Sequence, residues 1–162
     1  MIRFFRRAAY DIGGLRFSLE DIEHGILRAN RGQVGLPGPH YAGNDPRSAV
    51  TITDLDPRLH FALNCASASC PPVGVYTAEN LDEQLDMATR NFIDHEVKLD
   101  DKRDKLLISS LFKWYAKDFG GREGTIKLLL DYLPKDERYD WLSNIGGKPR
   151  IGYLRYDWSL NI

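Results

Sequence analysis

The residues between Thr77 and Phe92 carry the clearest structural signal in this sequence. Leu81, Leu85, Ala88 and Phe92 recur at helical spacing, and at about 100° per residue they fall within a stripe roughly 60° wide. Thr77, a residue type favoured just before a helix, precedes the stripe. The pattern predicts an amphipathic helix that buries one face, so the fold must supply a core for that face to cover.

The other predicted elements are short and alternate irregularly. Ser18 and Asp21 form a capping-box-like start for a helix that runs to about Asn30, and a Gly- and Pro-rich loop follows over residues 31–47. The remaining elements are a strand at 49–53, a hairpin over 97–109, helices over 111–119 and 125–133, and a last strand over 150–162. This mixture predicts an α+β fold: one helix-rich domain over residues 1–162 with a small, mostly antiparallel sheet.

Composition excludes several classes of protein. The 162 residues include 22 Lys or Arg and 23 Asp or Glu, and this balance argues against broad nucleic-acid binding, which needs a basic surface. The longest apolar runs, such as residues 126–130, are far too short to span a bilayer. The basic start lacks the apolar core of an export signal, so we expect a cytoplasmic location.

Both cysteines, Cys65 and Cys70, lie in one short stretch with only Ala and Ser between them. The stretch fits a catalytic thiol, a metal clip, a disulfide loop or a turn with buried structural cysteines. An unperturbed thiol is only about 3% thiolate at pH 7, so a nucleophilic Cys65 needs a base, a positive neighbour or a helix N-terminus. One cysteine pair and four scattered histidines make a poor zinc pattern, and the Gly-Gly pairs lack phosphate-loop spacing. We therefore expect no metal and no cofactor.

Glu23 and His24 are the candidate partners of the thiol. On the first predicted helix Glu23 lies about 40° from Leu19, within or beside the apolar face, and His24 lies about 140° from Leu19, toward the flank. A carboxylate on a buried helix face is costly unless it is paired. Either Glu23 or His24 faces a cleft as a base or orienting acid, or Glu23 forms a structural ion pair with an arginine such as Arg58.

His60 is a poorer partner for Cys65. Residues 59–65 fit either a strand or a helix that begins at Asp56-Pro57. On a strand His60 and Cys65 point to opposite faces, and on a helix they lie about 140° apart. We therefore expect His60 to be hydrogen-bonded and partly buried.

Three stretches resemble, in order and rough spacing, one family: "IGGLRFSLEDIEHGILR" at 12–28, "DPRLHFALNCASASCPP" at 56–72 and "YDWSLN" at 156–161. The chain is similar here to the domain-of-unknown-function family DUF-547 of bacteria and plants. Residues 76–93 and 106–119 also resemble later segments of that family. The resemblance implies no activity, because the family is named for having none established. Its members usually carry an upstream segment rich in Trp, Asn and Tyr, whereas this sequence begins just before "IGG", so we expect either a short version of the family or an incomplete start.

Two functional hypotheses follow. In the first, the chain is a thiol-dependent hydrolase or acyl transferase, in which Cys65 attacks an amide or ester carbonyl and His24, supported by Glu23, is the base. Small residues in the loop let a substrate approach, and the backbone N–H groups of residues 66–69 hold the oxyanion. The substrate-binding residues of this hypothesis are Asn64, Ala66, Ser67, Ser69 and His60.

In the second hypothesis, the chain is a non-catalytic binding or scaffold domain. Both cysteines then serve as packing residues, and Glu23 is a structural ion-pair partner. The aromatic C-terminal region, with Tyr156 and Trp158, would dock a protein partner.

Overall fold

The structure is a computed structural model that describes residues 2–100, 102, 104–145 and 149–161. Backbone contacts group the chain into two compact units, residues 1–56 and 57–162. Each unit has a small sheet of its own: β1-β2 in the first, and β3-β4-β5 in the second. The α+β prediction is confirmed, since helices predominate and, of the three strand pairs that the described residues form, two are antiparallel. That residues 1–162 form one domain stays a prediction.

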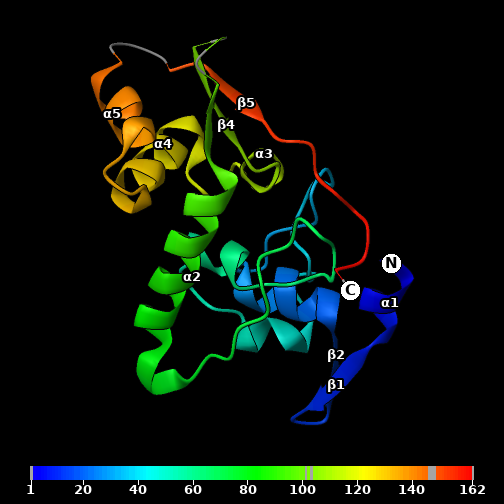
Figure 1. Ribbon diagram of the computed structural model, residues 1–162. Coiled ribbons are helices and arrows are strands. Elements are labelled where there is room, and N and C mark those ends of the chain that lie inside the picture. The colour runs from blue at the N-terminus through cyan, green and yellow to red at the C-terminus, as the bar shows by residue number, and fades with distance from the viewer. Residues whose placement is uncertain (1, 101, 103, 146–148, 162) are drawn as a thin grey trace. The chain divides into compact units, whose positions relative to one another are not determined.

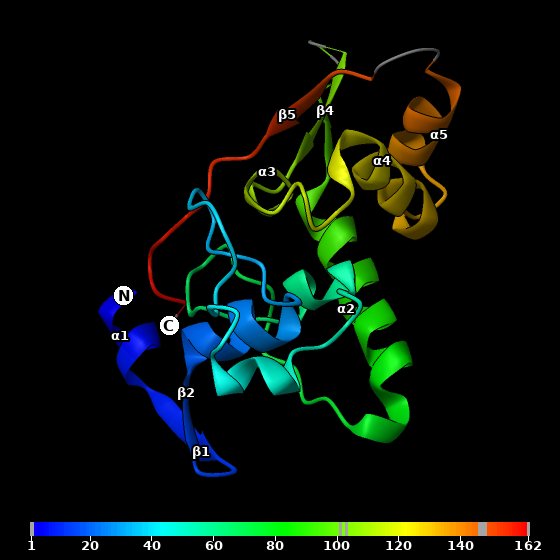
Figure 2. The same ribbon diagram turned by 180° about the vertical axis from the view of Figure 1, so that it is seen from behind.

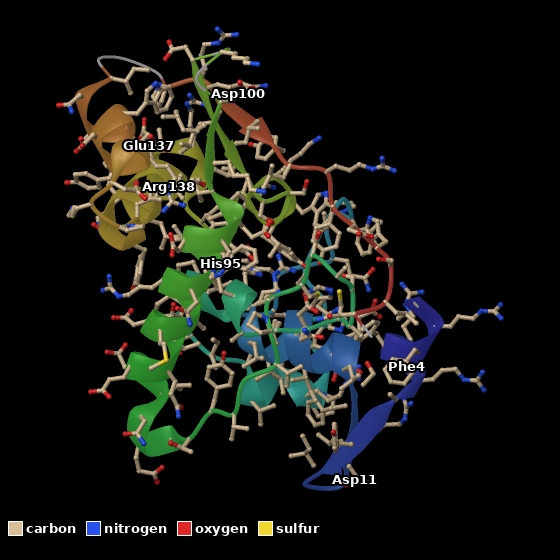
Figure 3. The ribbon with its side chains drawn as sticks, in the orientation of Figure 1. Phe4, Asp11, His95, Asp100, Glu137 and Arg138 are labelled. Carbon is tan, nitrogen blue, oxygen red and sulfur yellow. The ribbon has the colours of Figure 1, made fainter. Side chains whose placement is uncertain are left out.

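The first unit opens with a helix and a hairpin. Its first elements are α1 (Ile2–Arg7), β1 (Ala9–Ile12) and β2 (Leu15–Ser18). The two residues between the strands, Gly13 and Gly14, have φ values of 62° and 78°. Positive φ at both positions gives the tight turn whose twist matches the strands, and glycine adopts it without strain. Asp11, labelled near this turn in Figure 3, accepts a hydrogen bond from Gly14 N at 3.0 Å.

Ser18 and Asp21 start the next helix as predicted. Ser18 N donates to Asp21 Oδ2 at 2.8 Å, and Asp21 N donates to Ser18 Oγ at 3.1 Å. This reciprocal pair satisfies two backbone donors that would otherwise have no partner at the helix start. The helix that follows, η1 (Asp21–Leu27), is a π-helix.

The wider π winding places His24 differently from the expectation. Arg28 N donates to Glu23 O at 2.9 Å, and Asn30 N donates to Gly25 O at 3.2 Å, so both hydrogen bonds span five residues. A helix closed by such bonds turns less per residue than the 100° used for the prediction. His24, expected toward the flank, is therefore buried, with 9% of its surface exposed.

The loop predicted over residues 31–47 is confirmed up to Asp45, apart from one isolated bridge between Arg31 and Pro39. The strand predicted at 49–53 is wrong. Asp45 accepts a hydrogen bond from Arg47 N and Pro46 occupies the first helical position, so a 3₁₀ helix, η2 (Pro46–Val50), begins instead. Local capping overrides the β-branched composition of this run.

The second unit contains the predicted amphipathic helix. It begins with η3 (Pro57–Phe61), η4 (Ala78–Asn80) and α2 (Leu81–Glu96), the long helix of Figure 1. Leu85 and Phe92 of the stripe are buried as expected, but Leu81 at the helix start is 45% exposed. Thr77 makes no capping hydrogen bond from its side chain, because η4 intervenes before α2. The helical alternative for residues 59–65 is borne out at its start by η3.

The sheet of the second unit joins a hairpin to a strand from far along the chain. Strands β3 (Lys98–Asp100) and β4 (Lys105–Ile108) pair antiparallel, which confirms the predicted hairpin. Strand β5 (Ile151–Tyr153) pairs parallel to β4 on its other edge (Figure 1). The last strand is shorter than predicted, and the chain beyond Tyr153 continues without regular structure to an isolated bridge at Leu160.

Among the described residues between β4 and β5 lie the helices α3 (Leu111–Trp114), α4 (Gly121–Tyr132) and α5 (Glu137–Asn144), which Figure 2 labels. Helix α3 ends at Trp114, earlier than the predicted residue 119, and a turn continues to Gly120, which has φ of 74°. Arg138 on α5 donates to the carboxylate of Asp94 at 2.6 Å and to Val97 O at 3.0 Å, and so ties α5 to the end of α2 (Figure 3).

The core of the second unit is a cluster of buried apolar side chains. Phe61 of η3 stacks on Phe92 with ring centroids 4.9 Å apart and contacts Phe112 and Phe119 at 5.7 Å. The other members are Ile93, Val97, Leu106, Ile108, Leu111, Leu129, Leu133 and Leu142. Because Phe61 is buried in this core, it fixes the position of the backbone that leads into the stretch with the two cysteines.

Candidate functional site

The cysteine loop is defined here as residues 64–72. Its first residue, Asn64, joins the two ends of the loop through its side chain. Asn64 Oδ1 accepts a hydrogen bond from Ala66 N at 2.7 Å, and Asn64 Nδ2 donates to Pro71 O at 2.5 Å. Ala66 has φ of 63°, a left-handed conformation that few residues other than glycine adopt. The side-chain amide of Asn64, which was expected to bind substrate, thus holds the two ends of the loop together.

A second segment, residues 157–161, lies antiparallel along the loop. Ala68 N donates to Ser159 O at 2.8 Å, and Asn161 N donates to Ala66 O at 2.9 Å. Ser69 N donates to Asp157 O at 3.3 Å, and Ser69 Oγ accepts from Asp157 N at 2.9 Å. We call this segment the C-terminal strap. Together with Asn64 it occupies the N–H groups of Ala66, Ala68 and Ser69, which the sequence predicted as oxyanion donors.

The two sulfurs meet inside this loop. Cys65 Sγ and Cys70 Sγ are 2.7 Å apart, and both residues are free cysteines that are partly exposed. Cys70 Sγ also accepts hydrogen bonds from Cys65 N at 3.1 Å, from Ser67 Oγ at 3.3 Å and from the Tyr156 hydroxyl at 3.2 Å. Cys65 Sγ lies farther from the same two hydroxyls, 3.4 Å from Ser67 Oγ and 3.8 Å from that of Tyr156.

This asymmetry separates the two thiols chemically. The hydrogen bond from the Cys65 thiol, followed by those from Ser67, Tyr156 and Cys65 N–H, lowers the pKa of Cys70 to about 4, and these bonds outweigh the opposing effect of burial. Donating to Cys70, together with burial, raises the pKa of Cys65 above its usual value. At neutral pH the pair therefore carries one thiolate, on Cys70, and one protonated thiol, on Cys65.

Aromatic packing positions the Tyr156 hydroxyl. The Tyr156 ring lies 4.8 Å from that of Trp114 on α3 and 4.5 Å from that of Trp158, centroid to centroid. Burial, and next the hydrogen bond to Cys70, raise the pKa of Tyr156, so the phenol stays protonated and donates. Sequence reasoning missed this role: Tyr156 is 86 residues from Cys70, and no local pattern connects them.

Replacing Tyr156 by Phe is expected to raise the pKa of the Cys70 thiol by about one to two units. The change removes one hydrogen bond to a thiolate, which is worth about 1.5–3 kcal/mol, and one pKa unit corresponds to about 1.4 kcal/mol. The pH dependence of iodoacetamide labelling at Cys70, followed by peptide mass spectrometry, measures the shift. Tyr153→Phe, three residues earlier in β5 and 47% exposed, is the control and should leave the profile unchanged. An unshifted profile for Y156F would contradict the assigned hydrogen bond.

Glu23 and His24 lie in the first unit, on the π-helix. Glu23 Oε1 is 3.6 Å from His24 Nδ1, and the same ring nitrogen is 2.8 Å from Arg28 Nη1. The Glu23 side chain is 28% exposed and that of His24 is 11% exposed. The two residues are therefore neighbours, as the acid–histidine hypothesis requires, and their role at the thiol stays a prediction. Arg58, the suggested ion-pair partner of Glu23, binds Asp82 and Asp86 within the second unit.

His60 is more deeply buried than expected. Its Nε2 lies 2.9 Å from Asp118 Oδ2, and the two side chains are 2% and 1% exposed. The ring stacks on Tyr115 with centroids 4.1 Å apart. The predicted hydrogen bonding of His60 is confirmed, and its side chain is buried in the core a few residues before the cysteine loop.

Within the described part of the chain, no group of three or more His, Cys, Asp or Glu side chains is arranged to hold a metal ion. No helix among the same residues is both long enough and apolar enough to cross a membrane.

Comparison with known proteins adds one relationship. No curated protein and no solved structure matches the chain. A family model described as a protein of unknown function, DUF547, matches residues 1–93, which include Glu23, His24 and the whole cysteine loop. The match covers more than half of the chain and agrees with the resemblance seen in the sequence. The chain therefore belongs to the DUF547 family.

Proposed function

We propose that this DUF547 domain is a thiol-dependent hydrolase or acyl transferase whose nucleophile is a sulfur of the cysteine loop. The observation that carries the proposal is the convergence of donors on Cys70 Sγ: the Cys65 N–H and thiol, and the hydroxyls of Ser67 and Tyr156. A thiolate held in this way is available at neutral pH without a base, which an ordinary thiol is not. These contacts favour Cys70 as the attacking atom, with Cys65 as its donor.

In the proposed reaction, Cys70 Sγ bonds to the carbonyl carbon of an amide or ester, and the carbonyl electron pair moves onto oxygen. The Ser67 and Tyr156 hydroxyls, which border the sulfur, are the proposed donors to that oxyanion. When the electron pair returns, the bond to the amine or alcohol breaks, and this leaving group takes a proton from solvent. Water, or a second nucleophile, then attacks the thioester, loses its proton to solvent and releases the Cys70 thiolate.

Acylation of the reduced protein tests this proposal. The full chain, kept reduced with a phosphine, is mixed with p-nitrophenyl acetate at pH 6, and the burst of p-nitrophenol is followed by stopped flow. We expect one acetyl group per chain, mapped to Cys70 by peptide mass spectrometry. Cys70→Ser should abolish the burst, because a serine hydroxyl is not ionised at pH 6 and is a far weaker nucleophile than a thiolate.

Cys65→Ser is the matched variant, since it removes the other sulfur of the same loop. It should retain the burst, with its pH profile moved upward because one donor to the thiolate is weakened. An acetyl group mapped to Cys65 instead would assign the nucleophile predicted from the sequence. A wild-type chain that gives no burst and no acetylated peptide would sink the enzymatic proposal and favour the binding or scaffold alternative.

A further inference from the structure

The cysteine loop holds two sulfurs in contact, whereas acyl transfer needs only one. We propose that Cys70 and Cys65 form a thiol–disulfide exchange centre, in which Cys70 attacks a low-molecular-weight disulfide and Cys65 resolves the mixed disulfide. This activity goes beyond the proposed acyl chemistry and does not depend on it, because no step involves a carbonyl or the acid–histidine pair.

Unequal hydrogen bonding assigns the two roles. Cys70 Sγ accepts from a backbone N–H, two hydroxyls and the Cys65 thiol, so it is the sulfur that carries negative charge and attacks first. Cys65 keeps its proton and lies 2.7 Å from Cys70 Sγ, so it is already beside the sulfur that it must attack in the second step. An S–S bond is about 2.05 Å long, so closing it requires the sulfurs to move by less than about 1 Å.

The loop is built to keep this geometry in both redox states. Asn64 joins its two ends, and the C-terminal strap pairs with residues 66–69 between the cysteines. None of these hydrogen bonds involves a sulfur, so disulfide formation leaves them intact. Both cysteines are also partly exposed, which lets a small disulfide reach Cys70 from solvent.

The exchange balances as follows. Cys70 thiolate attacks one sulfur of a disulfide RSSR, forms Cys70–S–S–R and expels RS⁻. The Cys65 thiol then attacks Cys70 Sγ, its proton leaves with the second R group as RSH, and the Cys65–Cys70 disulfide forms. The substrate gains two electrons and the protein loses two. Two molecules of an external thiol reverse the reaction and restore the dithiol.

The same contacts also shift the equilibrium between the reduced dithiol and the disulfide. Closing the disulfide removes the charged acceptor that the Tyr156 and Ser67 hydroxyls and the Cys65 N–H all bind. Stabilising the thiolate therefore stabilises the reduced form, which makes the disulfide easy to reduce. This property belongs to catalytic or regulatory disulfides and not to structural ones.

Oxidised glutathione is the probe for the test. The reduced chain is mixed with an excess of it at pH 6 and at pH 8, quenched with acid and analysed by mass spectrometry. We expect the wild-type chain to end with a Cys65–Cys70 disulfide and no bound glutathione, and Cys65→Ser to accumulate one glutathione on Cys70. An ordinary thiol reacts roughly 80-fold more slowly at pH 6 than at pH 8, whereas the Cys70 rate should change less than threefold.

Three results would overturn the proposal: glutathione attached first to Cys65, an ordinary pH dependence of the wild-type rate, or a Cys65–Cys70 disulfide that resists millimolar reduced glutathione. The wild-type measurements need no substitution, so they hold even if a variant fails to fold. Failure here is distinct from failure of the acyl proposal, which is measured with both sulfurs reduced and with an ester that contains no disulfide.

Discussion

Asp118→Ala is expected to lower the free energy of unfolding by about 3–5 kcal/mol. Asp118 and His60 bind each other with side chains 1% and 2% exposed, and the pair joins η3 to the turn after α3. Removing the carboxylate leaves the buried imidazole without that partner, which costs far more than an exposed bond would. Urea denaturation followed by tryptophan fluorescence measures the loss, since Trp114 and Trp141 lie in the same unit.

Asp131→Ala is the matched control for Asp118→Ala. Asp131 pairs with Lys127 one helical turn away at 2.5 Å, with side chains 48% and 78% exposed, so its loss should cost less than about 0.5 kcal/mol. Asp118→Asn retains an acceptor for His60 and should fall between the two variants. If Asp118→Ala and Asp131→Ala destabilise equally, the buried pair contributes no more than a surface pair does.

Gly25→Ala is expected to destabilise the first unit by about 1–3 kcal/mol, although alanine favours a helix by about 1 kcal/mol over glycine. A Cβ at Gly25 would overlap the ring of Tyr41, whose residue surface is only 1% exposed. The ring cannot move aside cheaply, because its hydroxyl donates to Asp21 O at 3.0 Å and Asn30 holds its backbone on both sides. The overlap therefore outweighs the gain in helix propensity.

Gly43→Ala provides the comparison for Gly25→Ala. Nothing lies within 4 Å of a Cβ at Gly43, so this substitution should be neutral or slightly stabilising through the unfolded chain. Amide hydrogen exchange of residues 21–30 reports the local effect in both variants. Unchanged protection in Gly25→Ala would show that Tyr41 repacks without cost.

Local signals predicted the fold where a periodic or capping pattern decided it. Leu85 and Phe92 are buried because the apolar residues of α2 lie on one face of the helix, and that face packs against the core. Ser18 and Asp21 cap a helix through hydrogen bonds between residues three apart in the sequence. The strand prediction for residues 49–53 was wrong, because β-branched residues form a strand only where a neighbouring strand is available. The π winding of η1 was also missed, since no sequence rule separates it from an α-helix.

The candidate site was only partly accessible to sequence reasoning. The loop and both cysteines stand out locally, but one contributor to the difference between their sulfurs, the Tyr156 hydroxyl, is brought to them by the parallel pairing of β5 with β4. Asn64 was chosen for its polar side chain, yet its partners Ala66 N and Pro71 O are fixed by the backbone path. A contact that depends on long-range strand pairing cannot be predicted from the spacing of residues that are close in the sequence.

The distance along the chain between Cys70 and Tyr156 has a consequence during biosynthesis. A nascent polypeptide that has left the ribosome as far as residue 150 displays both cysteines but has neither the phenol nor the strap. Cys70 then lacks the hydrogen bond from the Tyr156 hydroxyl, so its pKa is higher than in the folded protein. The full lowering of the Cys70 pKa is thus acquired only after Tyr156 has been synthesised and has folded against the cysteine loop.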